Sequence, residues 1–483
     1  MLWRILAAVA LAGTVFPLSQ ATPREVSLLI TGATVVTMDA AGRVLSPGAV
    51  AIDGRDIVGV GSAESVRAQF SGRDTIEAPG QVVIPGLVNT HTHAPMVLYR
   101  GLADDLALMQ WLEKYIFPAE AKTVSPEFVR AGTRLAALEM IKSGTTAYAD
   151  MYYYEEEIAA ATKEAGIRGV LGQTIIQFPV PDAKTPSEGI ARATSFLQAW
   201  RGDELIVPAI APHAMYTLDT ATLKAIRAVA DRERAPVIIH LAETQDEVRF
   251  SREKYQATPV QYLESIGFWG PRTIAAHGVR LTPADIRLLA RRHVGIAHNP
   301  ESNMKLASGT APVVDLRKAG VPVGLGTDGA ASNNDLDMFE AMRQAAFLAK
   351  HATGDPRAIP ATTALQMATI EGARVLGMDR EMGSLEIGKR ADLAIVAMSA
   401  ARQTPVYDPV SHLVYASRGD DVQTLVVNGR VVMRDRRVLT LDETAVLAEA
   451  RKWADKVRAA VGRGQGPGAK RQGPGARDQG PGL

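Results

Sequence analysis

The sequence predicts an α/β protein, a (β/α)8 barrel accompanied by a small β-sandwich that both ends of the chain build. Short β-branched runs alternate with stretches of helical spacing between about residues 85 and 377, and they form eight strand–helix units. β-rich sequence lies on both sides of this region, where Asp53-Gly54 and Asn428-Gly429 indicate hairpin turns. A doubly wound α/β sheet is the alternative, because a strand count from one sequence is easily wrong.

The two ends of the chain differ in composition from the rest. Arg4 precedes an apolar run that ends at Leu18, and small residues follow up to Ala21. This pattern is typical of a signal peptide over residues 1–21, so we expect a periplasmic or secreted protein. A misassigned start codon would instead make the protein cytoplasmic. Repeats of QGPGA predict a flexible, disordered tail over residues 463–483.

Four structural parts are expected between these ends. They are the first part of the β-sandwich at 22–84, the barrel at 85–380, the second part of the sandwich at 381–440 and a C-terminal helix at 441–462. The eight barrel strands are expected in the runs LVNTHTH, TTAYADMY, GVLGQTIIQ, IVPAIAPHAMYT, PVIIHLAET, TIAAHGV, VGIAHNPESN and VPVGLGTDG. Segments such as EFVRAGTRLAALEMIKSG have the apolar spacing and the closing glycine of a helix.

Composition excludes several classes of protein. Hydrophobic residues make up 47% and charged residues 22% of the chain, which is ordinary globular usage and excludes a disordered protein or a coiled coil. With 53 basic and 52 acidic residues the net charge is +1, so nucleic acid and acidic membranes are not expected partners. Cysteine is absent, which excludes disulfides, thiolate metal sites and a cysteine nucleophile.

Histidines are concentrated at the predicted strand ends. The chain has nine histidines, and six of them follow a predicted barrel strand: His91, His93, His213, His240, His277 and His298. The carboxyl ends of the strands form the active site of a barrel. Each of these histidines could alone have a structural role, but their joint placement predicts a functional cluster.

Residues from the first and last strands are expected to meet when the barrel closes. His91 and His93 are two apart in a strand, so both side chains point to one face. Asp328, between Gly326 and Gly329 after the eighth strand, can join them, although Asp before Gly is more often a turn or helix-cap residue.

The fifth and sixth strands add three further groups. His240 and Glu243 are three apart, which would separate them in a continuous strand but not where the chain turns. His277 follows the sixth strand. Three histidines and one aspartate suit Zn²⁺, with Fe²⁺ as an alternative, and such an ion lowers the pKa of bound water to about 7. We expect one divalent metal, because the fourth strand offers His213 and no lysine for a second ion.

The motifs PGLVNTHTH, HLAET, AAHGV, HNPESNMKLASGTAPV and GLGTDGAASNN resemble those of the amidohydrolase superfamily. More closely, they resemble the 5′-methylthioadenosine/S-adenosylhomocysteine deaminases and their triazine-hydrolase relatives. The resemblance spans about residues 31 to 432 and implies a metal-bearing (β/α)8 barrel with a β-sandwich from both chain ends.

The resemblance also implies a role for each matching residue. His91, His93, His240 and Asp328 would bind the metal. Glu243 would protonate the purine ring, His277 would orient the attacking hydroxide, and Asp328 would share its proton. His213 would contact the substrate and Glu120 would bind the ribose hydroxyls, so Glu120, His213, Glu243 and Asp328 form the expected substrate site.

The expected reaction is hydrolytic deamination of a small adenosine-type nucleoside to the inosine form and ammonia. 5′-Methylthioadenosine, adenosine and S-adenosylhomocysteine are the candidate substrates. Gln173 stands where an arginine would meet the carboxylate of S-adenosylhomocysteine, with Arg192 as a substitute. Trp111 is expected either in the core or in a lid over the base, and His298 as an anchor of the seventh loop.

Two other functions stay open at this point. One is hydrolysis of a triazine or of a guanine-type ring on the same scaffold, for which Glu120 would have no use. The other is a catalytically silent secreted binding protein. The sequence leaves the oligomeric state open, a homo-oligomer included.

Overall fold

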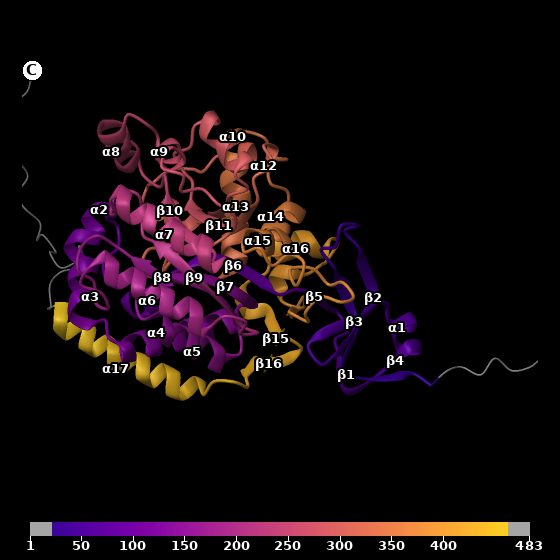
Figure 1. The fold of residues 1–483 in the computed structure, drawn as a ribbon. Coiled ribbons are helices and arrows are strands. Elements are labelled where there is room, and N and C mark those ends of the chain that lie inside the picture. The colour runs from indigo at the N-terminus through magenta and orange to yellow at the C-terminus, as the bar shows by residue number, and fades with distance from the viewer. Residues whose placement is uncertain (1–21, 462–483) are drawn as a thin grey trace, which may run out of the picture.

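A computed structural model describes residues 22–461 of the chain (Figure 1). The expected signal peptide, at 1–21, and the expected tail, at 463–483, lie outside the described residues. Within them, no helix combines the length and the apolar character needed to cross a membrane.

Eight parallel strands form the barrel, in the order in which they occur along the chain. Their short apolar sequences are buried on both faces, as expected of parallel strands covered by helices. The strands are β6 (Leu87–Thr92), β7 (Thr145–Tyr152), β8 (Arg168–Ile175), β9 (Ile206–Pro212), β10 (Val237–Leu241), β11 (Thr273–His277), β12 (Gly295–His298) and β13 (Val323–Leu325). Each lies within one of the eight predicted runs or overlaps it, so the predicted barrel is confirmed.

Helices follow the strands and cover the outside of the barrel (Figure 1). Several begin at a Ser, Thr or Asp whose side chain accepts a hydrogen bond from the backbone of the first turn, as Ser125 does for α4. The helices of this region are α2 (Leu108–Trp111), α3 (Phe117–Thr123), α4 (Pro126–Lys142), α5 (Glu155–Ala165), α6 (Pro186–Ala199), α7 (Thr220–Glu233), α8 (Gln245–Tyr255), α9 (Pro259–Ser265), α10 (Pro283–Arg291), α11 (Pro300–Lys305), α12 (Val313–Lys318), α13 (Met338–Thr353), α14 (Ala361–Met367) and α15 (Ile370–Val375).

Hydrogen bonds between the first and last strands close the barrel. The Thr90 hydroxyl donates to the carbonyl oxygen of Leu325 at 2.8 Å. Just beyond β13, the Asp328 N–H donates to the carbonyl oxygen of His91 at 3.0 Å. The sheet therefore closes on itself, and the alternative of an open doubly wound sheet is wrong.

The barrel interior is packed with small and branched apolar side chains. Alternate residues of each strand point inward, and they form one buried cluster that includes Val88, Ala147, Ala149, Val170, Ala209, Ala211, Ile238, Ile274 and Ala297. The residues at the carboxyl ends of the strands therefore lie on a tightly packed apolar interior.

The second domain is a mixed β-sheet that both ends of the chain build, as predicted. Strand β5 joins the two halves, since it pairs in parallel with β1 and antiparallel with β14. Side chains from both halves, such as Leu28, Val50, Leu393 and Val426, share one core. The strands are β1 (Arg24–Val36), β2 (Val44–Asp53), β3 (Asp56–Ser62), β4 (Phe70–Glu77), β5 (Gln81–Pro85), β14 (Leu393–Ala397), β15 (Val422–Val427), β16 (Arg430–Arg434) and β17 (Arg437–Val438).

The remaining helices lie outside these two sheets. Helices α1 (Ala63–Gln69) and α16 (Pro409–Tyr415) are short. The C-terminal helix α17 (Glu443–Val461) crosses the outside of the barrel beside α3 and α4 (Figure 1). Its Trp453 packs edge-on against Phe128 of α4, with ring centroids 5.4 Å apart.

Candidate metal centre and active site

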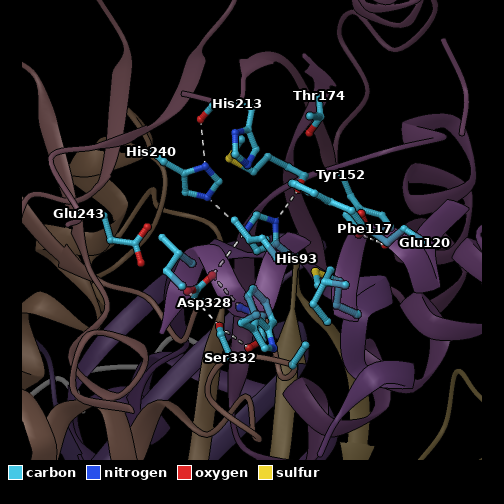
Figure 2. A pocket seen from close by; sticks show the side chains of 18 of the residues that line it. His93, Phe117, Glu120, Tyr152, Thr174, His213, His240, Glu243, Asp328 and Ser332 are labelled. Carbon is cyan, nitrogen blue, oxygen red and sulfur yellow. Dashed lines mark hydrogen bonds and ion pairs between the residues drawn. The ribbon is translucent and has the colours of Figure 1, made fainter. Parts of the chain in front are cut away.

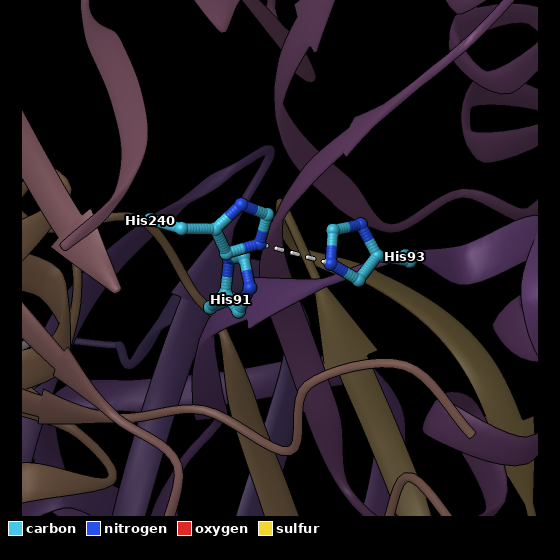
Figure 3. A group of neighbouring side chains, drawn as sticks. All are labelled: His91, His93 and His240. Atoms are coloured by element: carbon cyan, nitrogen blue, oxygen red, sulfur yellow. Dashed lines mark hydrogen bonds between the residues drawn. The ribbon is translucent and has the colours of Figure 1, made fainter. Parts of the chain in front are cut away.

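Three histidines from two strands converge at the carboxyl end of the barrel (Figure 3). His91 and His93 lie at the end of β6, and His240 lies near the end of β10. The Nε2 atoms of His93 and His240 are 3.2 Å apart, and the ring centroid of His91 lies 4.9 Å and 5.0 Å from theirs. One nitrogen of each ring faces the same small space.

The hydrogen bonds of two of these rings determine which nitrogen carries the proton. His93 Nδ1 lies 2.7 Å from the carbonyl oxygen of Met151, and His240 Nδ1 lies 2.9 Å from that of His213. Because a carbonyl can only accept, both Nδ1 atoms must donate. In the neutral rings both Nε2 lone pairs therefore point at each other, an arrangement that a cation between them would stabilise.

Asp328 adds a carboxylate to the three histidines. Its Oδ1 lies 3.4 Å from His91 Nε2 and 3.3 Å from His93 Nε2. The flanking glycines make this approach possible, because a Cβ on Gly326 would lie 2.9 Å from the His91 nitrogen. A Cβ on Gly329 would lie 3.2 Å from the Cβ of His93. Asp328 is thus a residue of the cluster, as predicted, and more than a turn residue.

Burial and mutual contact shift the protonation of this cluster. Burial, together with the charge on His93, lowers the pKa of His91 to about 4 despite the opposing contact with Asp328. Burial also disfavours the charged form of His93, but the Asp328 carboxylate raises the pKa of His93 to about 9. Asp328 thus attracts a positive charge to the point where the histidines meet. Neither nitrogen of His91 has a hydrogen-bond partner within residues 22–461.

The four side chains fit a divalent metal ion. They offer three imidazole nitrogens and one carboxylate, the donors that Zn²⁺ and Fe²⁺ accept. His91, His277 and Asp328 form a second overlapping group of mutually close donor atoms. One cation would bind one of the unpartnered nitrogens of His91 together with the opposed Nε2 lone pairs of neutral His93 and His240.

Glu243 reaches the cluster because the chain turns sharply after β10. Ala242 has a φ of 48°, in the left-handed region, and this reverses the strand alternation that would separate Glu243 from His240. Glu243 Oε2 lies 3.8 Å from His277 Nε2. Burial raises the pKa of the Glu243 carboxyl, which favours its protonated form. Glu243, His240 and His277 therefore lie close together, as predicted.

One cavity lies over the cluster and contains the predicted substrate residues (Figure 2). Glu243 lies on one side of it and Glu120, on α3, on the other (Figure 2). The hydroxyl of Tyr152 donates to Glu120 Oε1 at 2.7 Å, and burial raises the pKa of Glu120 to about 7. His213 also lines the cavity, and burial lowers its pKa to about 3, so its ring is neutral.

An apolar wall forms the rest of the cavity. Trp111 lines it with Leu108 and Leu112, so this segment covers the site and does not belong only to the core. The other apolar lining residues are Met96, Ile116, Phe117 and Leu306. Within the described chain, no lysine or arginine is among the residues that line this cavity.

Gln173 does not face the substrate cavity. Val170 of the same strand points into the barrel, so the alternation of β8 directs Thr174 inward and Gln173 outward. The Gln173 amide donates to Asp182 Oδ2 at 2.8 Å. Arg192 is also engaged elsewhere, because its guanidinium pairs with Glu156 and Asp182. Thr174 is therefore the strand residue that lines the cavity at this place.

Residues that were not predicted from the sequence hold the cluster from behind. Ser302 and Ser332 donate to Asp328 Oδ2 at 2.6 Å and 3.0 Å, so Oδ1 stays directed at the histidines. Asn303 Oδ1 lies 2.9 Å from His277 Nδ1, which leaves His277 Nε2 facing Glu243. The polar run HNPESN after the seventh strand was the available signal. His298 in that run is buried and does not line the cavity.

A closed (β/α)8 barrel with a histidine and aspartate cluster at its mouth defines a metal-dependent hydrolase scaffold. The model of the Amidohydrolase family matches residues 82–432. The chain belongs to this family, and the predicted membership is confirmed.

Relatives with related chemistry match almost the whole chain. It is 48% identical over 431 residues to a 5-methylthioadenosine/S-adenosylhomocysteine deaminase of Syntrophobacter fumaroxidans, which covers 89% of this chain and 98% of the relative. The crystal structure of an adenosine deaminase from Xanthomonas campestris with bound zinc has a TM-score of 0.89 at 42% identity, covering 91% of this chain and 100% of that one. The zinc-bound atrazine chlorohydrolase of Arthrobacter aurescens has a TM-score of 0.81 at 26% identity, covering 88% and 100%.

Proposed function

We propose that this protein deaminates adenosine-type nucleosides by metal-dependent hydrolysis, giving the inosine form and ammonia. One observation carries the proposal: a buried glutamate, Glu243, faces the histidine and aspartate cluster across a cavity whose opposite side holds a second buried carboxyl, Glu120. The first suits proton transfer to a ring, and the second suits recognition of a sugar. The deaminases among the relatives support the same chemistry.

His91, His93, His240 and Asp328 would hold the metal. A bound divalent ion acts as a Lewis acid and makes hydroxide available from water at neutral pH. We propose a single ion, because no lysine of the described chain lines the cavity to bridge a second one. Zn²⁺ is the ion we favour, since two of the similar proteins have zinc-bound structures.

Three side chains transfer protons or orient the attacking water. Water adds to the ring carbon that bears the amino group, and the bond from this carbon to the amino nitrogen later breaks. Glu243, whose pKa is raised by burial, gives a proton to the neighbouring ring nitrogen. His277, whose Nδ1 is bound to Asn303, offers Nε2 to orient the attacking oxygen. Asp328 accepts one proton from this oxygen, and that proton leaves with ammonia. The second proton of the oxygen returns to the Glu243 carboxylate, which restores Glu243 and leaves the ring in its inosine form.

The far side of the cavity determines which nucleosides fit. Tyr152 occupies one lone pair of Glu120 Oε1, which leaves Oε2 and the second lone pair of Oε1 for the two ribose hydroxyls. The 5′ group would lie along the apolar wall, where no lysine or arginine of the described residues can pair with a charged tail. We therefore propose uncharged 5′ groups, as in adenosine and 5′-methylthioadenosine, as the preferred ones.

An ammonia-release assay on metal-analysed protein tests this proposal. Adenosine, 5′-methylthioadenosine, S-adenosylhomocysteine and a chlorinated triazine are compared as substrates, and the first two should have the highest kcat/KM. Glu243→Gln should retain its metal but lose about 10²- to 10⁴-fold in kcat, the usual contribution of a general acid–base group. Turnover of the triazine alone, or a Glu243→Gln variant as active as the wild type, would contradict the proposal.

A further inference from the structure

We propose that Glu247 is a positioning residue, which holds the turn after β10 in the shape that brings Glu243 into the cavity. This inference rests on the proposed role of Glu243 in proton transfer. Glu247 itself does not line the cavity, so it would act only through its neighbour.

The Glu247 carboxylate binds two consecutive backbone N–H groups. Its Oε1 accepts from the Ala242 nitrogen at 2.9 Å, and its Oε2 accepts from the Glu243 nitrogen at 2.9 Å. The Glu247 side chain is itself buried, at 4% exposure, so water cannot replace either bond. Bonds from a backbone N–H to a carboxylate are among the stronger hydrogen bonds in proteins. One side chain thus fixes the backbone of both residues that follow the strand.

The carbonyl groups of the same turn are held from the other side. The Gly278 nitrogen donates to the Leu241 oxygen at 3.0 Å, and the Arg280 nitrogen donates to the Ala242 oxygen at 2.8 Å. Ala242 has to adopt a left-handed φ of 48° between these bonds, a conformation that is unfavourable for a residue other than glycine. The bonds of Glu247 offset this cost, and without them the turn can relax.

Glu247 is the third residue of α8, but its side chain does not make the hydrogen bond of an ordinary helix cap. Thr244 is the N-cap of α8 and accepts from the Glu247 nitrogen at 3.2 Å. In an ordinary capping box, the third helical residue then binds the N–H of the N-cap itself. Glu247 instead reaches past Thr244 to the two residues before it, which places its carboxylate directly behind the turn.

The next strand and helix provide a matched control. Thr282 and Asp285 form a capping box at the start of α10, where Asp285 Oδ2 accepts from the Thr282 nitrogen at 2.9 Å. Asp285 is as buried as Glu247, and it also accepts from the Thr258 hydroxyl at 2.6 Å. It does not line the substrate cavity. Loss of its carboxylate removes helix-capping bonds but neither of the two hydrogen bonds that Glu247 makes to the turn of Glu243.

The kinetic experiment compares Glu247→Gln with Asp285→Asn in the full-length, metal-loaded enzyme. An amide can accept only one of the two N–H groups and repels the other. We expect kcat of Glu247→Gln to fall about 10- to 100-fold, as for outer residues that orient a catalytic group. KM and the metal content should stay at their wild-type values. Asp285→Asn should lower the melting temperature but leave kcat unchanged. A wild-type kcat in Glu247→Gln, or an equal loss in Asp285→Asn, would overturn the proposal.

A crystal structure of Glu247→Gln separates this proposal from that of the function. Ala242 should leave its left-handed φ, and the Glu243 carboxyl should move away from His277 Nε2, from which it is 3.8 Å in the wild type. An unchanged turn would overturn the role of Glu247 whatever the substrate. A wild-type enzyme that releases ammonia from none of the nucleosides would contradict the proposed function, and this structural result would still decide the role of Glu247.

Discussion

Two buried polar clusters lie at opposite ends of the barrel strands, and they differ in how their hydrogen bonds are made. At the amino end of β8, the Arg168 guanidinium binds Asp392 Oδ2 at 2.6 Å, the Glu204 carbonyl oxygen at 2.8 Å and Asn428 Oδ1 at 2.7 Å. All three of its nitrogens have an acceptor. At the carboxyl end, His91 is equally buried, but neither of its nitrogens has a hydrogen-bond partner within the described chain.

The difference separates a structural site from a binding site. The Arg168 cluster joins the barrel to the β-domain, and because its polar groups are satisfied it needs nothing further. The histidine cluster leaves buried donor and acceptor atoms unpaired, which costs stability unless a ligand completes them. We therefore expect changes at the barrel mouth to affect binding and catalysis, and changes at the Arg168 cluster to affect folding.

The largest expected effect is the loss of metal on substitution of His91. His91→Ala should reduce the metal content of the purified protein from about one equivalent to almost none, because a four-donor site loses a central ligand. Ammonia release should disappear with the metal. Elemental analysis by mass spectrometry measures the first quantity.

His298→Asn is the matched control for this variant. His298 also lies at a strand end and is as buried as His91, but it is not among the clustered donor atoms. This variant should keep its metal. Equal metal loss in both variants would mean that the effect comes from general destabilisation and would remove His91 from the metal site.

Substitution of Arg168 should lower the stability of the fold and leave metal binding and catalysis unchanged. Arg168→Met leaves the Asp392 carboxylate buried without its partner, so the free energy of unfolding should fall by about 3–5 kcal/mol. The folded fraction should retain its metal and its kcat. Urea unfolding measures the stability, and the double variant Arg168→Met/Asp392→Leu should recover most of the loss. A single variant as stable as the wild type would contradict the structural role.

The smallest expected effect is the loss of kcat/KM when the substrate lacks one ribose hydroxyl. A 2′-deoxynucleoside leaves one acceptor of Glu120 unpaired, which costs about 1–3 kcal/mol. The kcat/KM for 2′-deoxyadenosine should therefore be roughly ten- to a hundredfold below that for adenosine. Glu120→Gln should weaken this discrimination. Equal kcat/KM for both nucleosides in the wild-type enzyme would remove Glu120 from the ribose site.

The sequence was informative where the physical pattern is local. Parallel buried strands are short apolar runs, and the sequence of each one here is local and continuous, so all eight could be located. The hairpin at Asn428-Gly429 has positive φ at both residues, 51° and 75°, as this pair of residues predicts. The histidines at the strand ends could be grouped because the barrel brings the carboxyl ends of its strands together.

The sequence was less informative where a side chain acts across the fold. The outward direction of Gln173 depends on the alternation of the whole strand β8, and a single matched position does not reveal it. The turn at Ala242 depends on a glutamate four residues beyond the one that it positions. Ser302 and Asn303 lie on α11, a short helix after β12, and they contact residues at or just beyond the ends of two other strands. These contacts can be identified only from the tertiary structure.

Closure of the barrel through Asp328 and His91 also couples folding to the metal. These two residues belong to the ends of the last and the first strands, and their backbones are hydrogen-bonded to each other. The complete donor set exists only when the sheet has closed, so an ion that binds the four side chains binds the fully folded barrel and not a partly assembled one. By mass action its binding energy adds to the stability of the native state. The metal content of a preparation therefore sets a lower bound on the fraction of its molecules that have completed the barrel.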